Sequence, residues 1–550
     1  MKTIDAIAKT LKAQGIEYLS CFPTTSMIEA AAQAGVRPII CRQERVGVHI
    51  ADGYSRVTNG ATPGVFAMQY GPGTENSFAG VATAFSDSVP MLLLPLGHPV
   101  DRQGVSPLFR SEVSYAAITK RVEVVTSTER VDGVMRRSLA ALRQGRPGPV
   151  MVEIPADVAM QEVSDFNGDA SHVKPVKSQG DPRDIDGAAK ALCSAQHPVI
   201  IAGQGILYAE ATEELRELSE YLAVPVLTTL MGKSAFPESH PLALGCATGS
   251  MPKVLHHFLH SSDLICGIGC SFTDHVMAMR LPEGRTIIHA TNDPVDVQKD
   301  LDVDYPIVGD AKLVLRQLLE ACKDITGNQA RSTDGVASQI ASINSEWLSD
   351  WMPKLTSDEV PITPFRVIWD LMRAIPPEDA IVTHDAGSPR ERMISFYRSA
   401  GPRSFIGWGR SHALGTGLGL IIGAKLAKPE KVCTYVTGDT AFGMVGLDFE
   451  TAVRERIPII ITLFNNGGMA GEARGVAEEE YQISNLGSDY ADLARAMGGH
   501  GERIENPAEI VPAFQRARRV TEAEGLPVLL EFMTNRERGS SGPGSDFKPV

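Results

Sequence analysis

The feature that most restricts the fold of this chain is a pair of polar motifs, each directly after a short apolar run. Gly438-Asp439-Thr440 follows the run 432–437, and Asn465-Asn466-Gly467-Gly468 follows the run 459–464. Residues 444–455, between the motifs, have a helical pattern. We therefore expect a strand–helix–strand unit. In a parallel sheet, such a unit brings both strand ends to the same edge.

The two motifs together indicate a site for a metal-bridged diphosphate. The carboxylate of Asp439 and the amide oxygen of Asn466 are hard ligands of the kind that Mg²⁺ prefers. The backbone amides at Thr440 and Ala441 open a helix and can face phosphate. For the Gly-Asp-Thr motif alone, a helix-capping Asp is the alternative, because Asp is common before helices. The Asn-Asn-Gly-Gly at the matching distance favours the metal site.

The composition limits the class of protein. With 550 residues the chain is long enough for about three domains, and 43% hydrophobic with 21% charged residues is typical of a soluble globular protein. We expect no membrane span and no signal peptide, because the apolar runs are short. The net charge of −14 disfavours nucleic acid as a partner. The eight cysteines are scattered, several within apolar runs, which indicates reduced thiols in a cytoplasmic protein.

The predicted fold class is α/β, with three doubly wound parallel-sheet domains. Short continuous apolar runs alternate with helical patterns, as is typical of parallel strands covered on both faces. Polar stretches at 164–186 and 324–360 divide the chain. The predicted domains are 1–165, 185–325 and 360–540, followed by a tail, 541–550. The tail is rich in Gly, Ser and Pro, so we expect a mobile end or a lid without core-forming residues.

The motifs resemble those of thiamine diphosphate (ThDP) enzymes of the acetolactate synthase-like group. The third block matches the signature Gly-Asp-Gly…Asn-Asn, with Thr440 in place of the last Gly. The first block is similar to the pyrimidine-binding domain, with Gln43 in place of a His. In the first block the likeness is carried by Arg42-Gln43-Glu44, Ala51-Asp52-Gly53-Tyr54-Ser55-Arg56 and Gly71-Pro72-Gly73 with Asn76. In the second block it is carried by Thr228-Thr229, 232–238 and Asp293-Pro294, and in the third also by Asp385-Ala386-Gly387 and 415–419.

The resemblance implies a role for each matching residue. Glu44 would hydrogen-bond the pyrimidine N1′ of ThDP and favour its imino tautomer. Asp439 and Asn466 would bind Mg²⁺ through their side chains, and Gly468 through its backbone carbonyl. Leu414 would support the bent shape of ThDP. The remaining implied cofactor contacts are Pro72, Asn76, Gly387, Ser388, Gly438, Thr440 and Ala441.

The resemblance also implies an assembly. In this group the cofactor lies between the first domain of one subunit and the third domain of its neighbour, so a homodimer or homotetramer is expected, with the active site between subunits. The central domain is left open between FAD, ADP and no ligand. Gly203-Gln204-Gly205 and Gly267-Ile268-Gly269 follow apolar runs there, but neither completes a dinucleotide fingerprint.

The implied reaction is that of a carboligase or decarboxylase dependent on ThDP and Mg²⁺. It would act on a small 2-oxo acid such as pyruvate, through attack by the ThDP C2 carbanion and an enamine intermediate. Alternatives are a lyase of the 2-hydroxyacyl-CoA lyase or oxalyl-CoA decarboxylase type and a sulfoacetaldehyde acetyltransferase-like enzyme. From other classes, a protein that only binds ThDP or an adenine nucleotide remains, and a nicotinamide oxidoreductase is the weakest reading.

The substrate-facing segments depart from the group. Phe109-Arg110-Ser111-Glu112 stands where acetolactate synthases carry Phe-Gln-Glu, with Ser111 at the place of the Gln. Thr24 and Thr25 lie in a turn that is Gly-rich in the group, and Arg110 or Arg474 has the fork that pairs with a carboxylate. Turn-capping hydroxyls and solvated arginines are the alternatives. The predicted substrate contacts are Thr24, Thr25, Ser111, Glu112 and Arg474.

Overall fold

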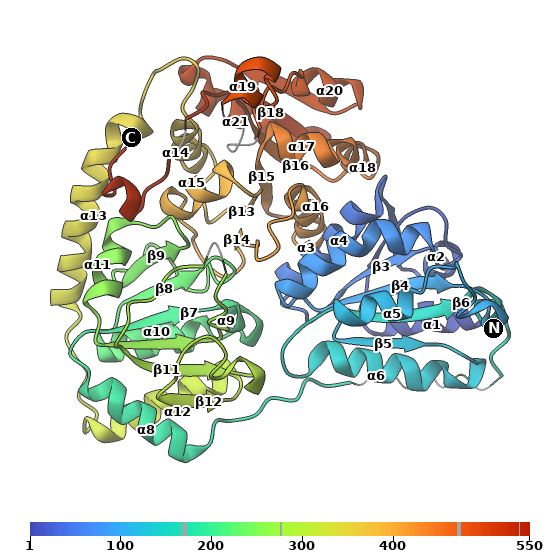
Figure 1. The fold of residues 1–550 in the computed structure, drawn as a ribbon, viewed down its shortest axis with the longest axis horizontal. Helices are drawn as coiled ribbons and strands as arrows, with labels where there is room; N and C mark the ends of the chain where they lie inside the picture. Colours follow the sequence, from blue (N-terminus) through green and yellow to red (C-terminus); the bar gives the residue numbers. More distant parts are fainter. Residues whose placement is uncertain are drawn as a thin grey trace.

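The computed structural model of the chain describes residues 1–164, 166, 168, 173–275, 278–469, 475–537 and 539–549. Arg474, a predicted substrate contact, lies outside these residues. The described residues form three six-stranded sheets, one in each third of the chain. Figure 1 shows them as three lobes, the first at the right, the second at the lower left and the third at the top. Every pairing between named strands is parallel. The predicted α/β class with three parallel-sheet domains is confirmed.

The first sheet has the strand order β2-β1-β3-β4-β6-β5. Its strands are β1 (Tyr18–Cys21), β2 (Arg37–Ile40), β3 (Gly64–Met68), β4 (Met91–Gly97), β5 (Arg121–Val124) and β6 (Val150–Pro155). The helices around it are α1 (Thr3–Ala13), α2 (Met27–Gln33), α3 (Glu44–Val57), α4 (Pro72–Ser86), α5 (Ser111–Ser114), α6 (Val131–Arg143) and α7 (Ala156–Ala159), with 3-10 turns η1 (Val100–Arg102), η2 (Tyr115–Ala117) and η3 (Thr128–Arg130). Strands β3, β4 and β6 are buried along their whole length, as their continuous apolar runs require.

The central sheet has the strand order β12-β11-β10-β7-β8-β9. Its strands are β7 (Pro198–Ala202), β8 (Val226–Thr229), β9 (Ala243–Ala247), β10 (Leu264–Ile268), β11 (Thr286–Thr291) and β12 (Tyr305–Val308). The helices are α8 (Pro182–Ser194), α9 (Gln204–Ala209), α10 (Thr212–Leu222), α11 (Lys253–Ser261) and α12 (Ala311–Ile325), with the 3-10 turn η5 (Pro294–Asp296). Among the residues described, no helix of any domain is long and apolar enough to cross a membrane.

The third sheet has the strand order β14-β13-β15-β16-β18-β17. Its strands are β13 (Ala380–His384), β14 (Phe405–Ile406), β15 (Val432–Gly438), β16 (Ile459–Asn465), β17 (His500–Ile504) and β18 (Val528–Met533). The helices are α14 (Pro364–Ala374), α15 (Ser388–Phe396), α16 (Thr416–Ala427), α17 (Asp439–Val445), α18 (Phe449–Arg454), α19 (Val476–Tyr481), α20 (Tyr490–Ala496) and α21 (Ile510–Glu524), with 3-10 turns η6 (Gly446–Asp448), η7 (Pro507–Glu509) and η8 (Pro543–Ser545).

Between the two motifs, the helix differs from its predicted range of 444–455. It begins at Asp439, the residue after the strand, and η6 separates α17 from α18. The break falls at Gly446, where the ring of Phe442 occupies the place that a Cβ would take. As a result, Asp439, Thr440 and Ala441 form the first turn of a helix that points its amino end at the sheet edge.

The tail and the polar stretch before the third domain are more ordered than their composition indicates. Residues 324–360 contain α13 (Asp334–Leu355), a helix of 22 residues that buries Trp347 and Trp351. The indole nitrogen of Trp351 donates to the carbonyl of Phe547 at 2.7 Å, and that of Trp347 to the hydroxyl of Ser541 at 3.1 Å. The expectation that the tail lacks core-forming residues is wrong, because Phe547 is only 7% exposed. The domain limits themselves stay predictions.

The first and third domains meet where α3 crosses α16 in the centre of the molecule (Figure 1). Cβ atoms at Gly53 or Gly423 would lie within 3.0 Å of backbone atoms of the facing helix, so only glycine permits this approach. Beside the crossing, Arg56 forms buried ion pairs with Asp52 and Asp87, at 2.5 and 3.0 Å, and donates to the carbonyl of Gly407. This contact fixes α3, whose first residue is Glu44, against the third domain.

Candidate active site

Four segments bring the predicted cofactor and metal residues of the third domain to one edge of its sheet. Strands β13, β15 and β16 are parallel neighbours, so their carboxyl ends lie side by side. The residues at this edge are Gly387 and Ser388 after β13, Leu414 in the turn before α16, Gly438 with Thr440 and Ala441 around the start of α17, and Asn466 with Gly468 after β16.

Asp439 has the surroundings of a metal ligand. Its side chain is buried, with the residue 3% exposed, and Oδ1 accepts a hydrogen bond from the Thr440 amide at 2.7 Å. The other oxygen, Oδ2, is buried and has no hydrogen-bond partner among the residues described. Burial raises the pKa of this carboxyl, while the amides of Thr440 and residues 466–468 lower it. Because a buried oxygen without a partner is costly, the arrangement fits a bound cation.

The loop after β16 is fixed in a shape that suits the same cation. Gly467 has a φ of +62°, and the Gly468 amide donates to Oδ1 of Asn466 at 2.9 Å. The two bonds that tie this loop to residues 484–486 use the Gly467 carbonyl and the Met469 amide, so both bypass the Gly468 carbonyl. Arg536 donates to the Asn466 carbonyl at 3.0 Å. One carboxylate, one amide oxygen and one carbonyl that accepts no hydrogen bond from the described residues are therefore available, which suits Mg²⁺.

A second group of predicted residues lies at the edge of the first sheet. Glu44 opens α3 after β2, yet it is only 4% exposed, unlike a surface capping residue. Its Oε2 accepts a hydrogen bond from the side-chain amide of Asn76 at 3.3 Å. Asn76 and Pro72 are exposed in the first turns of α4. The structure thus brings Glu44 and Asn76 together at the surface of the first domain.

The predicted substrate contacts already have protein partners. The hydroxyl of Ser111 donates to Oε2 of the buried Glu153, and burial raises the pKa of that carboxyl. Glu112 forms an ion pair with Arg110 at 2.7 Å. The Thr25 hydroxyl accepts from the amide of Met27, the first residue of α2, at 3.3 Å. Thr24 is exposed in the same turn. These bonds link Ser111 to β6 and Thr25 to α2 rather than to Glu44.

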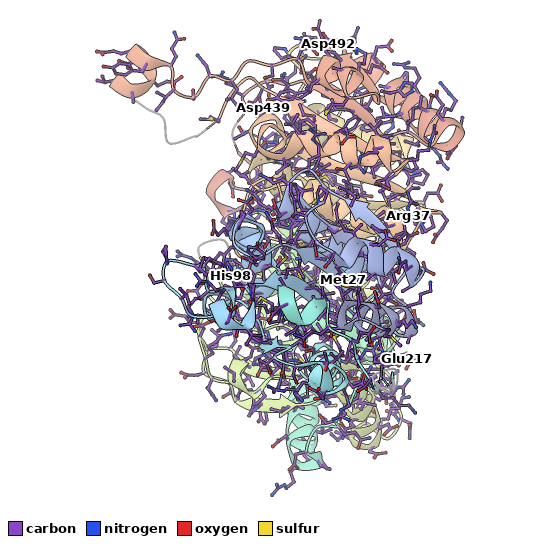
Figure 2. All side chains as sticks on the ribbon, turned by 90° about the vertical axis from the view of Figure 1, so that its right-hand side faces the viewer. Met27, Arg37, His98, Glu217, Asp439 and Asp492 are labelled. Atoms are coloured by element: carbon purple, nitrogen blue, oxygen red, sulfur yellow. The ribbon has the colours of Figure 1, made fainter. Side chains whose placement is uncertain are left out.

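His98, which the sequence analysis did not single out, lies at the same edge of the first sheet. It follows β4 directly, and its ring centroid lies 4.7 Å from that of the exposed Tyr70. Its Nε2 is buried without a hydrogen-bond partner among the residues described. In the view of Figure 2, Asp439 of the third domain lies above His98. A sequence signal for His98 was present, since it is a polar residue directly after the apolar run of β4, much as Asp439 follows β15.

A cavity of about 1370 Å³ lies where the three domains meet. Loops after β7, β10 and β11 of the central domain line it, together with parts of the other two domains. Gly205 and Gly269 approach so closely that a Cβ on Gly269 would lie 2.8 Å from the Gly205 Cα. Arg410 of the third domain reaches across, donating to the Ser86 carbonyl at 2.9 Å and the Ser271 hydroxyl at 2.5 Å. The two glycine motifs of the central domain therefore shape the wall of this cavity.

The fold and the site define a three-domain α/β enzyme with polar residues gathered at the edges of its outer sheets. Comparison with known families agrees. Residues 1–120 match the thiamine pyrophosphate enzyme N-terminal TPP binding domain, residues 185–318 its central domain, and residues 385–532 its C-terminal TPP binding domain.

Similar proteins are found along almost the whole chain. It is 33% identical to the probable acetolactate synthase large subunit of Methanococcus aeolicus, over 97% of this chain and 92% of that protein. The corresponding protein of Methanocaldococcus jannaschii is also 33% identical, over 96% and 92%. The acetolactate synthase large subunit of Corynebacterium glutamicum is 32% identical, over 91% and 81%. The chain belongs to the thiamine pyrophosphate enzyme family, which confirms the resemblance read from its motifs.

Proposed function

We propose that this protein is a carboligase or decarboxylase that uses ThDP and Mg²⁺ and acts on a small 2-oxo acid such as pyruvate. One observation carries the proposal: Oδ2 of Asp439, which is buried and has no hydrogen-bond partner in the described part of the chain, lies beside a loop with amide and carbonyl oxygens. A cap has no need of such an oxygen, whereas a cation that bridges to a diphosphate does. The similarity to acetolactate synthase large subunits supports the choice of substrate.

The chain's own residues divide the work. Asp439, Asn466 and the Gly468 carbonyl hold Mg²⁺, while Gly387, Ser388 and the first turn of α17 bind the diphosphate. Leu414 supports the bent cofactor. Bound ThDP supplies a nucleophilic carbon that adds to the substrate carbonyl and stores the electrons left by C–C cleavage.

Glu44 moves the proton that this chemistry requires. Its carboxyl holds and returns a proton at the pyrimidine N1′, and Asn76 orients it through the 3.3 Å bond to Oε2. Because Glu44 is buried, bulk water does not compete for that proton. Thr24 and Glu112, with Arg474, lie on segments proposed to face the substrate, and the bonded hydroxyls of Thr25 and Ser111 shape those segments.

We propose that the central cavity holds a nucleotide, either FAD or ADP. Its volume of about 1370 Å³ exceeds that of ordinary small-molecule sites. Positive side chains suited to phosphate line it: Arg143, Arg146, Lys177, Arg280, Arg390 and Arg410. Denaturing the purified protein and analysing the released compounds by absorbance and mass spectrometry tests this. Flavin or ADP in a near-stoichiometric amount supports the proposal, and neither compound, even after incubation with each, refutes it.

The same cavity favours one alternative substrate. A lyase acting on a 2-hydroxyacyl-CoA needs room for the nucleotide end of its substrate, and the cavity is large enough for one. The Ser111 hydroxyl, held by Glu153, also departs from the Gln of acetolactate synthases. If pyruvate is inert while ThDP binds, acyl-CoA compounds are the substrates to assay next, and after them sulfoacetaldehyde.

We propose that the active unit is a homodimer or homotetramer, with the site completed by a second copy. Large apolar side chains near both half-sites are exposed: Phe78, Phe85, Val113, Met444 and Leu447. A second copy would cover them. Light scattering after size exclusion tests the assembly. Phe85→Asp should shift the protein toward monomer, while Val295→Asp, at an exposed apolar residue of the central domain, should not. Equal behaviour of the two variants would contradict this interface.

The site of action is proposed to be the cytoplasm, because all eight cysteines are free thiols.

The main test of function is turnover of pyruvate by the purified protein with ThDP and Mg²⁺. Release of carbon dioxide together with acetolactate supports the proposal. Failure to bind ThDP at all would overturn it, and binding of ThDP without turnover of any 2-oxo acid or acyl-CoA would leave only a binding protein.

A further inference from the structure

A buried arginine lies behind the amino end of α15, next to a predicted diphosphate contact. Arg392 is 2% exposed. Its Nη1 donates to the carbonyl of Ser388 at 3.0 Å and also to the Ser388 hydroxyl. Its Nη2 donates to the carbonyl of Glu537 at 2.7 Å. The remaining donor, Nε, is buried without a partner among the residues described. The guanidinium is therefore aimed at the first residue of α15.

The charge of Arg392 is not balanced by the described part of the chain. The two nearest carboxylates are used elsewhere, since Glu537 pairs with Lys354 at 3.0 Å and Glu391 with Arg390 at 2.7 Å. Burial lowers the pKa of Arg392 to about 10, even though Glu537 and Glu391 act in the opposite direction. A buried cation without a paired anion is unfavourable, and an arginine does not escape by losing its proton near neutral pH. The site is complete only when an anion is present.

The surroundings show where that anion would lie. The Ser388 hydroxyl accepts its bond from Arg392, so its own proton is left to donate, and no described residue takes it. Gly387, with a φ of +82°, is exposed and has no atom within 4 Å of the place where a Cβ would stand. The amino end of α15, a helix of nine residues, opens onto this space. A helix dipole, a serine donor and a buried cation therefore converge on one open point.

We propose that Arg392 acts through Ser388 to supply the fixed positive charge that binds the diphosphate of the cofactor. It is a positioning residue, which orients the serine hydroxyl and strengthens it as a donor. The need for it follows from Pro389, which has no N–H and removes one of the amides that the first turn of α15 would otherwise offer. This inference rests on the proposed function, because it assumes that the bound group is ThDP.

The test measures binding rather than turnover. The full-length apoprotein, with Mg²⁺, is titrated calorimetrically with ThDP, with inorganic pyrophosphate and with thiamine, which lacks the phosphates. Arg392→Gln should weaken ThDP and pyrophosphate by about ten- to hundredfold, the range of one charge-assisted hydrogen bond, and leave thiamine unchanged. Ser388→Ala should cause a loss of the same kind, because it removes the hydroxyl through which Arg392 acts. Equal weakening of thiamine and ThDP, or no weakening, would overturn the proposal.

Arg403 provides a matched control. Its pKa is also lowered to about 10 by burial, and its guanidinium lies 4.8 Å from the ring of Tyr208, as that of Arg392 lies 4.8 Å from Phe365. It contacts Asn59 of the first domain instead of α15. Arg403→Gln should lower the melting temperature as Arg392→Gln does, without changing the ratio of ThDP to thiamine affinity. The same change of ratio in both variants would refute a specific role.

Two further outcomes keep the two proposals separate. If Arg392→Gln does not fold, Arg392→Lys is the deciding variant, because it keeps the positive charge but loses the planar guanidinium. Weaker ThDP binding with unchanged thiamine binding supports the role of Arg392. Unchanged ThDP binding refutes it. If the unmodified apoprotein binds pyrophosphate in an Arg392-dependent way but binds no ThDP, the proposed function fails while the anion site stands. If it binds ThDP and no variant affects that binding, only the inference about Arg392 fails.

Discussion

Replacing Asp439 by Asn should stabilise the protein without cofactor and abolish metal binding at the proposed Mg²⁺ site. Oδ1 of Asp439 accepts from the Thr440 amide, and an amide oxygen can take over that bond. Oδ2 has no partner among the described residues, and burial raises the pKa of the carboxyl, so its ionised form is disfavoured there. Asn removes the charge while filling the same space. We therefore expect Asp439→Asn to raise the stability of the apoprotein and to lower its affinity for metal.

The size of each effect follows from this environment. An unpartnered buried polar group costs about 1–3 kcal/mol, and because the new amide is polar too, we expect a gain of about 1 kcal/mol in the free energy of unfolding. For a domain of about 150–250 residues this raises the melting temperature by about 2–4 °C. Adding ThDP and Mg²⁺ at about a hundredfold excess over Kd should raise the free energy of unfolding of the unmodified protein by about 2.7 kcal/mol. It should leave the free energy of unfolding of the variant unchanged.

Differential scanning calorimetry with and without ThDP and Mg²⁺ measures both effects. Asp385→Asn is the matched control, because both carboxylate oxygens of that buried Asp are bonded, to the Gly415 amide at 3.1 and 3.2 Å and to the Tyr435 hydroxyl at 2.5 Å. It should destabilise the apoprotein. A loss of stability in Asp439→Asn as large as in Asp385→Asn would show that Asp439 is a structural cap, and the reasoning would be refuted.

Three more predictions concern other parts of the molecule. Glu44→Gln should lower kcat by about a hundredfold or more while ThDP affinity stays within a few fold, because only proton transfer is lost. Steady-state kinetics measures the change in kcat and calorimetry the affinity for ThDP. Unchanged turnover would indicate a protein that only binds the cofactor. Burial raises the pKa of Asp448 to about 6, so its carboxyl favours folding below about pH 4 and this contribution is lost as the pH rises through 6. Asp448→Asn should raise stability at pH 7 by up to about 3 kcal/mol and flatten that pH window in urea titrations, and a steeper dependence would contradict the assignment. Phe547→Ala should lower the free energy of unfolding by about 3–5 kcal/mol, whereas Val308→Ala, at an exposed strand residue, should lower it far less; equal urea midpoints would mean that the Phe547 ring, which contacts that of His256 in α11, is not part of the core.

The fold was predictable from sequence because its signals are local. Each buried parallel strand is a continuous apolar run, and the polar residues that end such runs must share an edge. The start of α17 was missed, since Asp439 to Gly443 carry no helical periodicity and the turn is set by its place after β15. The packing of the tail was missed because the partners of Ser541 and Phe547, Trp347 and Trp351, lie about two hundred residues away.

The site was predictable only as far as residue type decides the role. Asp439, Asn466 and Glu44 stand where the strand ends require them. Thr25 was chosen for its hydroxyl and Ser111 for its place at the position of the Gln, but whether a hydroxyl is free depends on which residue folding brings beside it, here the Met27 amide and Glu153. Arg392 was missed for the converse reason. Its interest lies in a hydrogen-bond partner that is missing among the described residues, and a sequence does not record a missing partner. His98 could have been noticed, because it is a polar residue directly after an apolar strand.

The crossing of α3 and α16 has a consequence for how this enzyme can change over evolutionary time. Where Gly53 and Gly423 meet the facing backbone there is no side chain to repack, so a substitution cannot be absorbed by a new rotamer. Neutral substitutions at these two glycines are therefore excluded, and α3, which begins at Glu44, keeps its position. The loops that hold Thr24, and Ser111 on its short helix, carry no such constraint. New substrate preferences are accordingly expected to arise in those loops, while the position of Glu44, the proposed proton-transfer residue, is inherited unchanged.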